Sequence, residues 1–275
     1  MKILNGNELV DYIKERQIKQ ARALRLSWRT IPRLAIVRTG ENEVIDVYMR
    51  LKQNYGSDVA IEVDIHHVKS DELIATIEQL NADETVHGIV VQLPLENTDQ
   101  TAEAVNAVSP DKDVDGLGEN TKFTPATAQA IDWLLAGYNV ELNYKKIAII
   151  GRGRLVGAPL FKLWKSSHYD VEVYGRDAED LSSIVKNADI IVTATGTPGL
   201  ITSEMLKEKA VVVDAGTASE NGKVVGDLAE DVRTRNDLTI TPIKGGVGPL
   251  TITALFENVI LAARKVANIK GQQDI

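Results

Sequence analysis

Short apolar runs rich in β-branched residues alternate with helical patterns along almost the whole chain. In the first half the strand runs are residues 33–39, 59–66 and 87–93, and helical spacing of apolar residues covers 7–24, 42–55, 70–81 and 98–107. Strands that alternate with helices form βαβ units, whose strands pair in parallel sheets. The alternation therefore predicts an α/β fold.

The second half continues the alternation and ends in a long amphipathic helix, expected over 252–270. Its strand runs are residues 146–150, 171–174, 189–193, 210–214 and 238–241. At about 150 residues per domain, 275 residues favour two domains. Turn formers crowd the segment DGLGENTKFTP, before a helix expected over 125–137. We predict a first domain over 1–121, closed by the helix 252–275, a Rossmann-type domain over 122–251, and a cleft between them.

Composition narrows the classes of function. The chain has no cysteine, which excludes disulfides, thiolate metal sites and a cysteine nucleophile, and its four histidines show no metal-ligand spacing. A net charge of -8 and a pI near 5.2 argue against a nucleic-acid partner. We see no apolar run near the ~20 residues that cross a bilayer, and the charged N-terminal segment is unlike a signal peptide. These features predict a cytoplasmic protein without a metal, a nucleic-acid partner or a membrane anchor.

The clearest local signal is a glycine loop between an apolar strand and a helical pattern. The loop is G-x-G-x-x-x-G, with glycines at 151, 153 and 157. In dinucleotide-binding folds the first glycine makes the tight turn, the second lets the backbone approach a pyrophosphate, and the third packs helix on strand. The alternative is a tight βα turn that binds nothing. The strands that follow in order favour a nucleotide site.

Cofactor choice depends on the end of the next strand, where an acidic residue favours NAD. Glu172 lies inside that strand and is expected to point away. Arg152 and Arg176 together form a site for a 2′-phosphate, which favours NADP, whereas Asp177 keeps NAD open. Alternatively, both arginines are solvated surface charges.

The segment NEVIDVYMRLKQNY carries the second candidate site. The pattern predicts one helical stripe made of Val44, Val47, Tyr48, Leu51 and Tyr55. Tyr48 and Lys52 are four residues apart and share a face, which places Lys52 at the edge of this stripe. A desolvated lysine has a lowered pKa and can act as a general acid or base. The alternative is a lysine that extends along a core tyrosine to reach solvent.

Three further segments are candidates. Gln92 ends an apolar strand, at the edge of an open α/β sheet where ligands bind, or is an ordinary polar terminus. Asp113 and Asp115 belong to the acidic turn SPDKDVDG, which binds a ligand amine or a metal or is purely structural. The cluster GGVGP at 245–249 permits close backbone approach to a ligand or serves only as a helix entry.

In order along the chain, these segments resemble the bifunctional methylenetetrahydrofolate dehydrogenase/cyclohydrolase family. The resemblance covers nearly the whole chain. Its segments are the Y-x-x-x-K element of Tyr48 and Lys52, VVQLPL at 90–95, PDKDVDGL at 110–117, GRGRLVGAP at 151–159, TATG at 193–196, VVVDAG at 211–216, VVGDL at 224–228 and TPIKGGVGPLT at 241–251.

The resemblance implies a specific chemistry. Family members oxidise 5,10-methylenetetrahydrofolate to the methenyl form with a nicotinamide cofactor and hydrolyse that product to 10-formyltetrahydrofolate. It further implies that Lys52 is the general acid/base, that Tyr48 stacks on the folate, that Gln92 tunes Lys52 and that Asp115 binds the pterin. Substrate contacts are implied for Gly245, Gly246 and Pro249. Cofactor contacts are implied for Gly151, Arg152, Gly153, Val156, Gly157, Arg176, Thr195 and Gly196. The implied cofactor is NADP, with NAD possible, and the implied assembly is a homodimer.

The sequence departs from the family pattern at several positions. Ile45 stands where a serine is common, Gly153 replaces the serine of the cofactor loop, Lys244 replaces a proline, and the loop after residue 117 is short. Because most of these changes face the cofactor or the domain junction, the alternative function is a monofunctional cyclohydrolase or an inactive folate-binding regulator. Another two-domain oxidoreductase, such as a shikimate dehydrogenase, is a third possibility.

Overall fold

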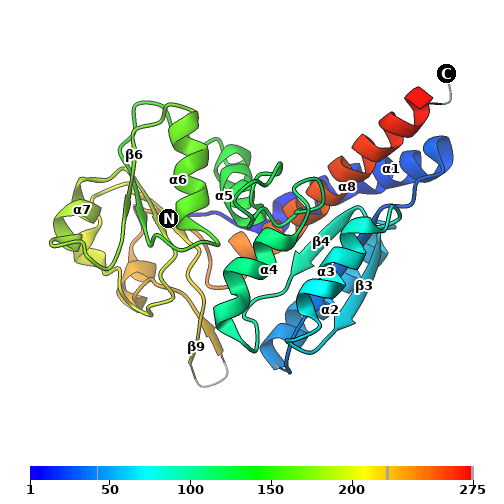
Figure 1. The fold of residues 1–275 in the computed structure, drawn as a ribbon. Coiled ribbons are helices and arrows are strands. Elements are labelled where there is room, and N and C mark those ends of the chain that lie inside the picture. Colours follow the sequence, from blue (N-terminus) through cyan, green and yellow to red (C-terminus); the bar gives the residue numbers. More distant parts are fainter. Residues whose placement is uncertain (42, 221–222, 274–275) are drawn as a thin grey trace. The chain divides into compact units, whose positions relative to one another are not determined.

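The computed structural model describes residues 1–275 except 42, 221–222 and 274–275. The chain forms two compact units, each an α/β structure with a parallel sheet (Figure 1). Unit 1 consists of Met1–Val10 and Thr127–Thr251. Unit 2 consists of Asp11–Ala126 and Ile252–Ile275. The first ten residues thus group with the second sheet, which differs from the division expected from sequence.

The reason for this grouping is a two-residue strand, β1 (Lys2–Ile3), that the sequence analysis did not include. It pairs in parallel with β11 (Thr239–Ile240), and the Leu4 amide donates to the Ile240 carbonyl at 2.8 Å. So short a strand has no detectable period of its own. Its position is set by hydrogen bonds to a strand more than two hundred residues away.

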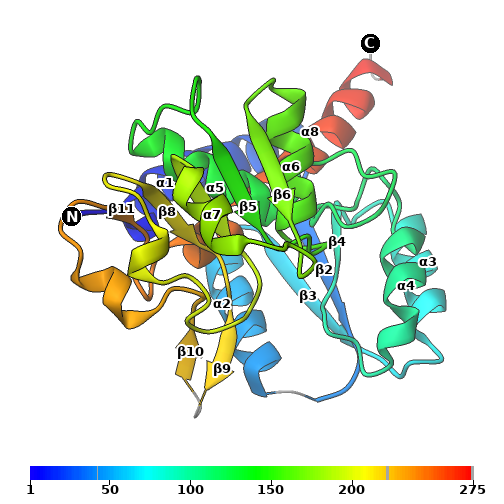
Figure 2. The ribbon, with the colours of Figure 1, turned by 90° about the vertical axis from the view of Figure 1, so that its left-hand side faces the viewer.

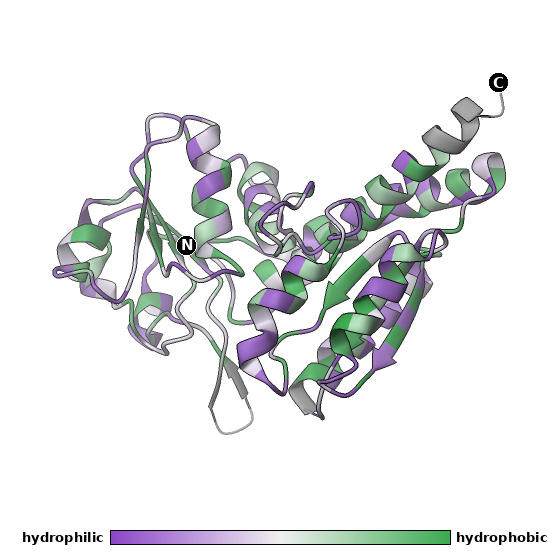
Figure 3. Ribbon diagram, in the orientation of Figure 1, coloured by the Kyte–Doolittle hydropathy of each residue, from purple (hydrophilic) through white to green (hydrophobic). Residues whose placement is uncertain are grey.

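Unit 2 contains a three-stranded parallel sheet in the order β3-β2-β4. Helices α3 and α4 pack on one face of β2 and β4, where the buried side chains include Val37, Ile77, Ile89 and Val105. Figure 3 shows α3 and α4 with alternating hydrophilic and hydrophobic bands, as expected for helices that bury one face. The elements are β2 (Arg33–Arg38), α2 (Glu43–Asp58), β3 (Glu62–His67), α3 (Leu73–Ala82), β4 (Gly88–Val91), α4 (Thr101–Ala107) and parts of α1 (Gly6–Trp28) and α8 (Val247–Gln273).

Unit 1 contains a six-stranded parallel sheet in the order β1-β11-β8-β7-β5-β6. β5 lies between β6 and β7, so the strand order reverses at β5 (Figure 2). This is the doubly wound arrangement predicted for the second domain. The elements are α5 (Ala126–Gly137), β5 (Ile147–Ile150), α6 (Gly157–Ser166), β6 (Val171–Tyr174), α7 (Leu181–Asn187), β7 (Ile190–Thr193), β8 (Val211–Asp214), and an antiparallel hairpin of β9 (Ala218–Glu220) and β10 (Lys223–Val225).

Helix α8 corrects two sequence-based statements. It begins at Val247 rather than near residue 252, so Gly248 and Pro249 lie in its first turn, where proline is tolerated. Over Val247–Asn268 it is also long and apolar enough, by length and composition, to cross a membrane. However, 67% of the most apolar stretch of this helix is buried inside the protein, as in the core helix of a globular domain.

Candidate functional site

Helix α2 presents a different face to the core from the one its sequence predicts. Val47, Tyr48 and Leu51 are 47%, 38% and 46% exposed, so the predicted apolar stripe is wrong at these three positions, whereas Tyr55 is buried as predicted. The side chain of Val44 lies outside the described residues. The buried positions are Ile45 and Met49, and Lys52 follows them at helical spacing. Lys52, which is half-buried, therefore lies in line with these buried positions, because the helix is rotated relative to the expectation.

Lys52 is held by the end of the central sheet of unit 2. Its ammonium donates a hydrogen bond of 2.8 Å to the side-chain oxygen of Gln92, which follows β4. The other side of the Gln92 amide is fixed as well, because its NH₂ group donates to the Leu93 carbonyl at 3.0 Å. The orientation of Gln92 is thus set by the backbone, and the amide oxygen faces the lysine.

A half-buried carboxyl group, that of Asp115, completes this cluster. Desolvation by burial lowers the pKa of Lys52, and the charge of Asp115 acts against that shift. Burial raises the pKa of Asp115, while Lys52 lowers it and the neighbouring Asp113 raises it further. A lysine and a carboxyl group whose pKa values are both moved towards neutrality are suited to proton transfer. The structure brings Lys52, Gln92 and Asp115 together within unit 2.

Three charged residues of the acidic turn at 109–118 have different contacts. Lys112 caps helix α3, since its ammonium donates to the carbonyls of Leu80, Asn81 and Asp83 at 2.7–2.9 Å. The buried carboxylate of Asp113 accepts the amides of Gly116, Leu117 and Gly118 at 2.9–3.3 Å. Asp113 is therefore a structural residue, and Asp115 is the carboxyl group of this turn whose charge acts on Lys52.

Helix α8 fixes the backbone around Asp115. The buried Asn258 donates to the carbonyls of Val114 and Thr124 at 2.8 and 2.9 Å, which joins the two ends of the loop. Gly116 has a φ of +74°, and a Cβ there would lie 2.7 Å from the Cα of Pro125. Sequence reasoning missed Asn258. The sequence signal that could have identified it is the position of this polar residue inside the apolar run of the last helix.

In unit 1 the glycine loop has the geometry expected of a nucleotide-binding turn. Gly151 has a φ of +114°, and a Cβ there would lie 2.5 Å from the carbonyl oxygen of Ala194. At Gly157 a Cβ would overlap the carbonyl oxygen of Gly151, so this glycine packs helix α6 against the strand. A Cβ on Gly153 would meet no heavy atom of the described residues within 4 Å. The space beside Gly153 is therefore open to a ligand. Val156 is the residue that precedes α6.

The loop lies where ligands bind in doubly wound sheets. β5 pairs with β6 on one side and β7 on the other, and such a reversal of strand order opens a crevice beyond the carboxyl ends of the strands. The turn after β7 contains Thr195 and Gly196, whose φ is +64°. The close approach of Gly151 to Ala194 shows that the glycine loop and this turn are neighbours.

A fully buried aspartate, missed in the sequence analysis, holds the turn after β7. Asp227 accepts hydrogen bonds from the Thr193 hydroxyl at 2.5 Å, the Thr195 amide at 2.7 Å and the Thr197 amide at 2.9 Å. Asp214 in turn accepts the Asp227 amide at 3.0 Å, and burial raises the pKa of Asp214. Both aspartates lie in segments that resemble the family, at 211–216 and 224–228. Their spacing along the sequence does not indicate which groups they contact.

Inside β6, Glu172 is exposed and lies 3.4 Å from Lys165, in agreement with the prediction that it points away from the cofactor loop. Arg152 points to Asp177: its Nη1 lies 3.1 and 3.2 Å from the two carboxylate oxygens. Arg176 is exposed. The side chain of Arg152 thus reaches the segment after β6 that contains Arg176 and Asp177.

The glycines at 245 and 246 contact the chain's own N-terminal segment. The Gly6 amide donates to the Gly245 carbonyl at 2.7 Å, and a Cβ on Gly6 would overlap the Gly246 carbonyl oxygen. Gly245 has a φ of +84°, which favours glycine. Pro249 follows in the first turn of α8. The close approach at this cluster is therefore to Gly6.

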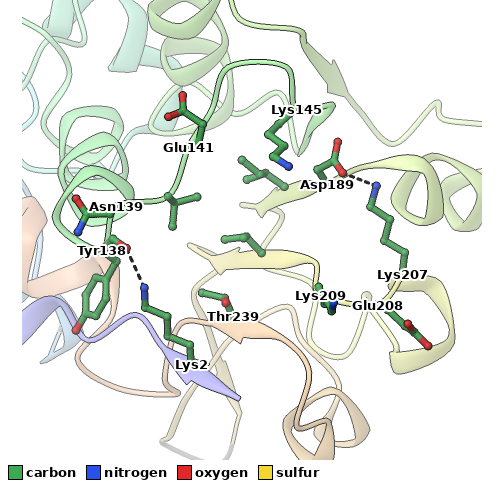
Figure 4. A pocket seen from close by; sticks show the side chains of 13 residues that line it. Lys2, Tyr138, Asn139, Glu141, Lys145, Asp189, Lys207, Glu208, Lys209 and Thr239 are labelled. Carbon is green, nitrogen blue, oxygen red and sulfur yellow. Dashed lines mark hydrogen bonds and ion pairs between the residues drawn. The ribbon is translucent and has the colours of Figure 1, made fainter.

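A polar pocket of about 360 Å³ lies at the opposite, amino-terminal ends of the strands of unit 1 (Figure 4). Two of its lysines are already engaged, Lys207 with Asp189 at 2.6 Å and Lys2 with the Tyr138 carbonyl at 2.9 Å. Because ligands of doubly wound sheets bind at the carboxyl ends of the strands, this pocket does not coincide with the nucleotide loop.

Comparisons with known proteins agree with this geometry. The protein-family model of the tetrahydrofolate dehydrogenase/cyclohydrolase catalytic domain matches residues 4–115 of the sequence. The family model of the corresponding NAD(P)-binding domain matches residues 125–267. A bifunctional protein FolD from Staphylococcus aureus (strain bovine RF122 / ET3-1) is 34% identical over 278 residues, covering 96% of each chain.

Two solved structures are similar over nearly their whole length. The bifunctional FolD methylenetetrahydrofolate dehydrogenase/cyclohydrolase of Campylobacter jejuni has a TM-score of 0.91 and 33% identity, over 96% of this chain and 99% of that one. The Trypanosoma brucei enzyme, complexed with NADP cofactor and inhibitor, has a TM-score of 0.89 and 29% identity, over 96% and 97%.

Proposed function

This chain belongs to the tetrahydrofolate dehydrogenase/cyclohydrolase family, and on that premise we propose that it is a bifunctional enzyme of one-carbon metabolism. It oxidises 5,10-methylenetetrahydrofolate to the methenyl form with NADP and hydrolyses that product to 10-formyltetrahydrofolate. The family match decides against a shikimate dehydrogenase. The observation that carries the proposal is the partly buried cluster of Lys52, Gln92 and Asp115.

In this proposal Lys52 is the general acid/base of the hydrolysis. Burial lowers its pKa, so a larger fraction of the amine is neutral and able to take a proton from the attacking water. Gln92 orients the Lys52 ammonium through the 2.8 Å hydrogen bond. Asp115 binds the pterin through its carboxyl group, and the exposed ring of Tyr48 stacks on the folate.

The residues of unit 1 fit a dinucleotide. The open space at Gly153 leaves room for a pyrophosphate near the amino terminus of α6, whose amides and dipole favour an anion. The backbone at Gly151–Gly157 and the Thr195-Gly196 turn would hold the cofactor, and Arg152 and Arg176 are the cations available to a 2′-phosphate. When bound, NADP accepts the hydride of the oxidation. Gly245, Gly246 and Pro249 would contribute to substrate binding, as the family resemblance implies.

Two finer assignments belong to this proposal. The enzyme acts as a homodimer, because pairing through the second domain is usual in the family it resembles. It acts in the cytoplasm, consistent with its lack of cysteine and with its folate substrates.

The test is an assay of the purified chain with 5,10-methylenetetrahydrofolate. With NADP, the proposal expects the absorbance of the methenyl product to rise and then decay as hydrolysis proceeds. Methenyltetrahydrofolate supplied alone should be hydrolysed without any nucleotide. Hydrolysis without NADP-dependent oxidation would support the monofunctional cyclohydrolase instead. Folate binding without either reaction would support a folate-binding regulator.

A further inference from the structure

The strand end that receives the cofactor's ribose contains an ion pair built around a glycine. Arg152 Nη1 contacts both carboxylate oxygens of Asp177, and Arg152 Nε donates to the Val173 carbonyl at 3.3 Å. The pair lies over Gly175, where a Cβ would come within 2.6 Å of Asp177 Oδ1 and 3.4 Å of Arg152 Cδ. The absence of a side chain at Gly175 makes room for this arrangement.

We propose that Asp177 is the residue that sets the choice between NADP and NAD in this chain. The proposal rests on the dinucleotide site of the proposed function. In doubly wound folds an acidic side chain at this strand end accepts hydrogen bonds from the ribose hydroxyl of NAD, and a nearby arginine accommodates the 2′-phosphate of NADP. Here both side chains are present, and they are paired with each other.

The pairing has opposite consequences for the two cofactors. A 2′-phosphate must compete with the Asp177 carboxylate for Arg152, and two anions that contact the same guanidinium repel each other. A ribose diol carries no charge, so it can donate to Asp177 while the ion pair stays in place. The site therefore binds both cofactors, and its preference for NADP is weaker than an arginine without a carboxylate partner would give.

Calorimetric titration of the purified chain with NADP and with NAD, at one fixed salt concentration, tests this inference without turnover. In Asp177→Asn the carboxylate charge is removed, and we expect NADP affinity to rise about tenfold while NAD affinity falls. Asp177→Ser removes the same charge with a shorter side chain and should change the ratio in the same direction. Arg152→Gln should lower NADP affinity and leave NAD affinity within about threefold.

Glu172→Gln is the matched control. Glu172 lies in β6, the strand that precedes Asp177, and it is exposed and pairs with Lys165, so its loss changes the net charge equally without touching the loop. A ratio of NADP to NAD affinity that is the same in Asp177→Asn as in Glu172→Gln would overturn the role of Asp177. Failure of the wild-type chain to bind either nucleotide would overturn the proposed dehydrogenase function as well, so the two failures are distinguishable.

Discussion

The Lys52 ammonium on helix α2 donates a 2.8 Å hydrogen bond to the Gln92 amide oxygen at the end of β4. Forty residues separate the two in sequence. The bond links a helix to the carboxyl edge of the sheet, and Asp115 adds the nearby negative charge.

Replacing Lys52 by methionine should abolish hydrolysis of the methenyl substrate. Methionine fills similar space but cannot transfer a proton, and general acid–base catalysis contributes about 10²–10⁴-fold to a rate. The rate of methenyl decay, measured without nucleotide, checks this. Arg50→Met removes an exposed cation from the same helix and should retain the rate. Undiminished hydrolysis by Lys52→Met would contradict the role of Lys52 as the general acid/base.

The pH profile of hydrolysis should move in opposite directions in two variants. Asp115 favours the charged form of Lys52, so Asp115→Asn lowers the Lys52 pKa and shifts the profile to lower pH. Gln92→Glu places a carboxylate against the ammonium, raises its pKa and shifts the profile to higher pH. Profiles of kcat report the enzyme–substrate complex and separate this effect from weaker binding. Coincident profiles for all three proteins would contradict a titrating Lys52.

Two glycine variants of the cofactor loop should affect different properties, one the NADP affinity and the other the thermal stability. Gly153→Ala should fold with an unchanged melting temperature but bind NADP weakly, because the new methyl group occupies the space left for the ligand. Gly157→Ala should lower the melting temperature, since its Cβ overlaps the Gly151 carbonyl oxygen. Thermal unfolding and NADP titration check both. Full NADP affinity in Gly153→Ala would argue against pyrophosphate binding at this loop.

Asp227→Asn should weaken cofactor binding while leaving hydrolysis intact. One amide oxygen cannot replace two carboxylate oxygens that together accept the Thr195 and Thr197 amides and the Thr193 hydroxyl. We expect about tenfold lower NADP affinity and a loss of about 1–3 kcal/mol in unfolding free energy. Asp231→Asn, which changes an exposed residue that accepts one amide, is the control. Equal effects of the two variants would contradict a specific role for Asp227.

Tyr55→Phe should destabilise the protein at neutral pH and remove part of its alkaline sensitivity. The Tyr55 hydroxyl donates to the buried Gln17 at 2.7 Å, and losing one partner of a buried hydrogen bond costs about 1–3 kcal/mol. Burial raises the pKa of Tyr55 from 10.0 to about 12. Between those values the folded state keeps a proton that the unfolded state releases, so wild-type stability falls as pH rises through this window. Urea unfolding from pH 9 to 12 should show a shallower fall for Tyr55→Phe, and parallel curves would contradict it.

Local pattern predicted much of this protein. The alternation of strand runs and helical spacing predicted two parallel sheets, and the strand–glycine–helix sequence predicted the nucleotide loop. Both are local signals, because apolar periodicity and the need for a positive φ belong to a few consecutive residues. The ordered motifs pointed to the family and to Lys52, Gln92 and Asp115.

The tertiary structure decided which of several equivalent residues does what. Residue spacing alone treated Asp113 and Asp115 alike, but the backbone amides fold around Asp113, whereas the charge of Asp115 acts on Lys52. The tertiary structure rotated α2 so that the half-buried Lys52 lies in line with the buried Ile45 and Met49. It also brought Asp227 into hydrogen bonds with a turn at Thr195, more than thirty residues earlier in the chain. These relationships depend on hydrogen bonds and burial between distant segments. Because such contacts exist only once the sheets are assembled, no spacing within one segment records them.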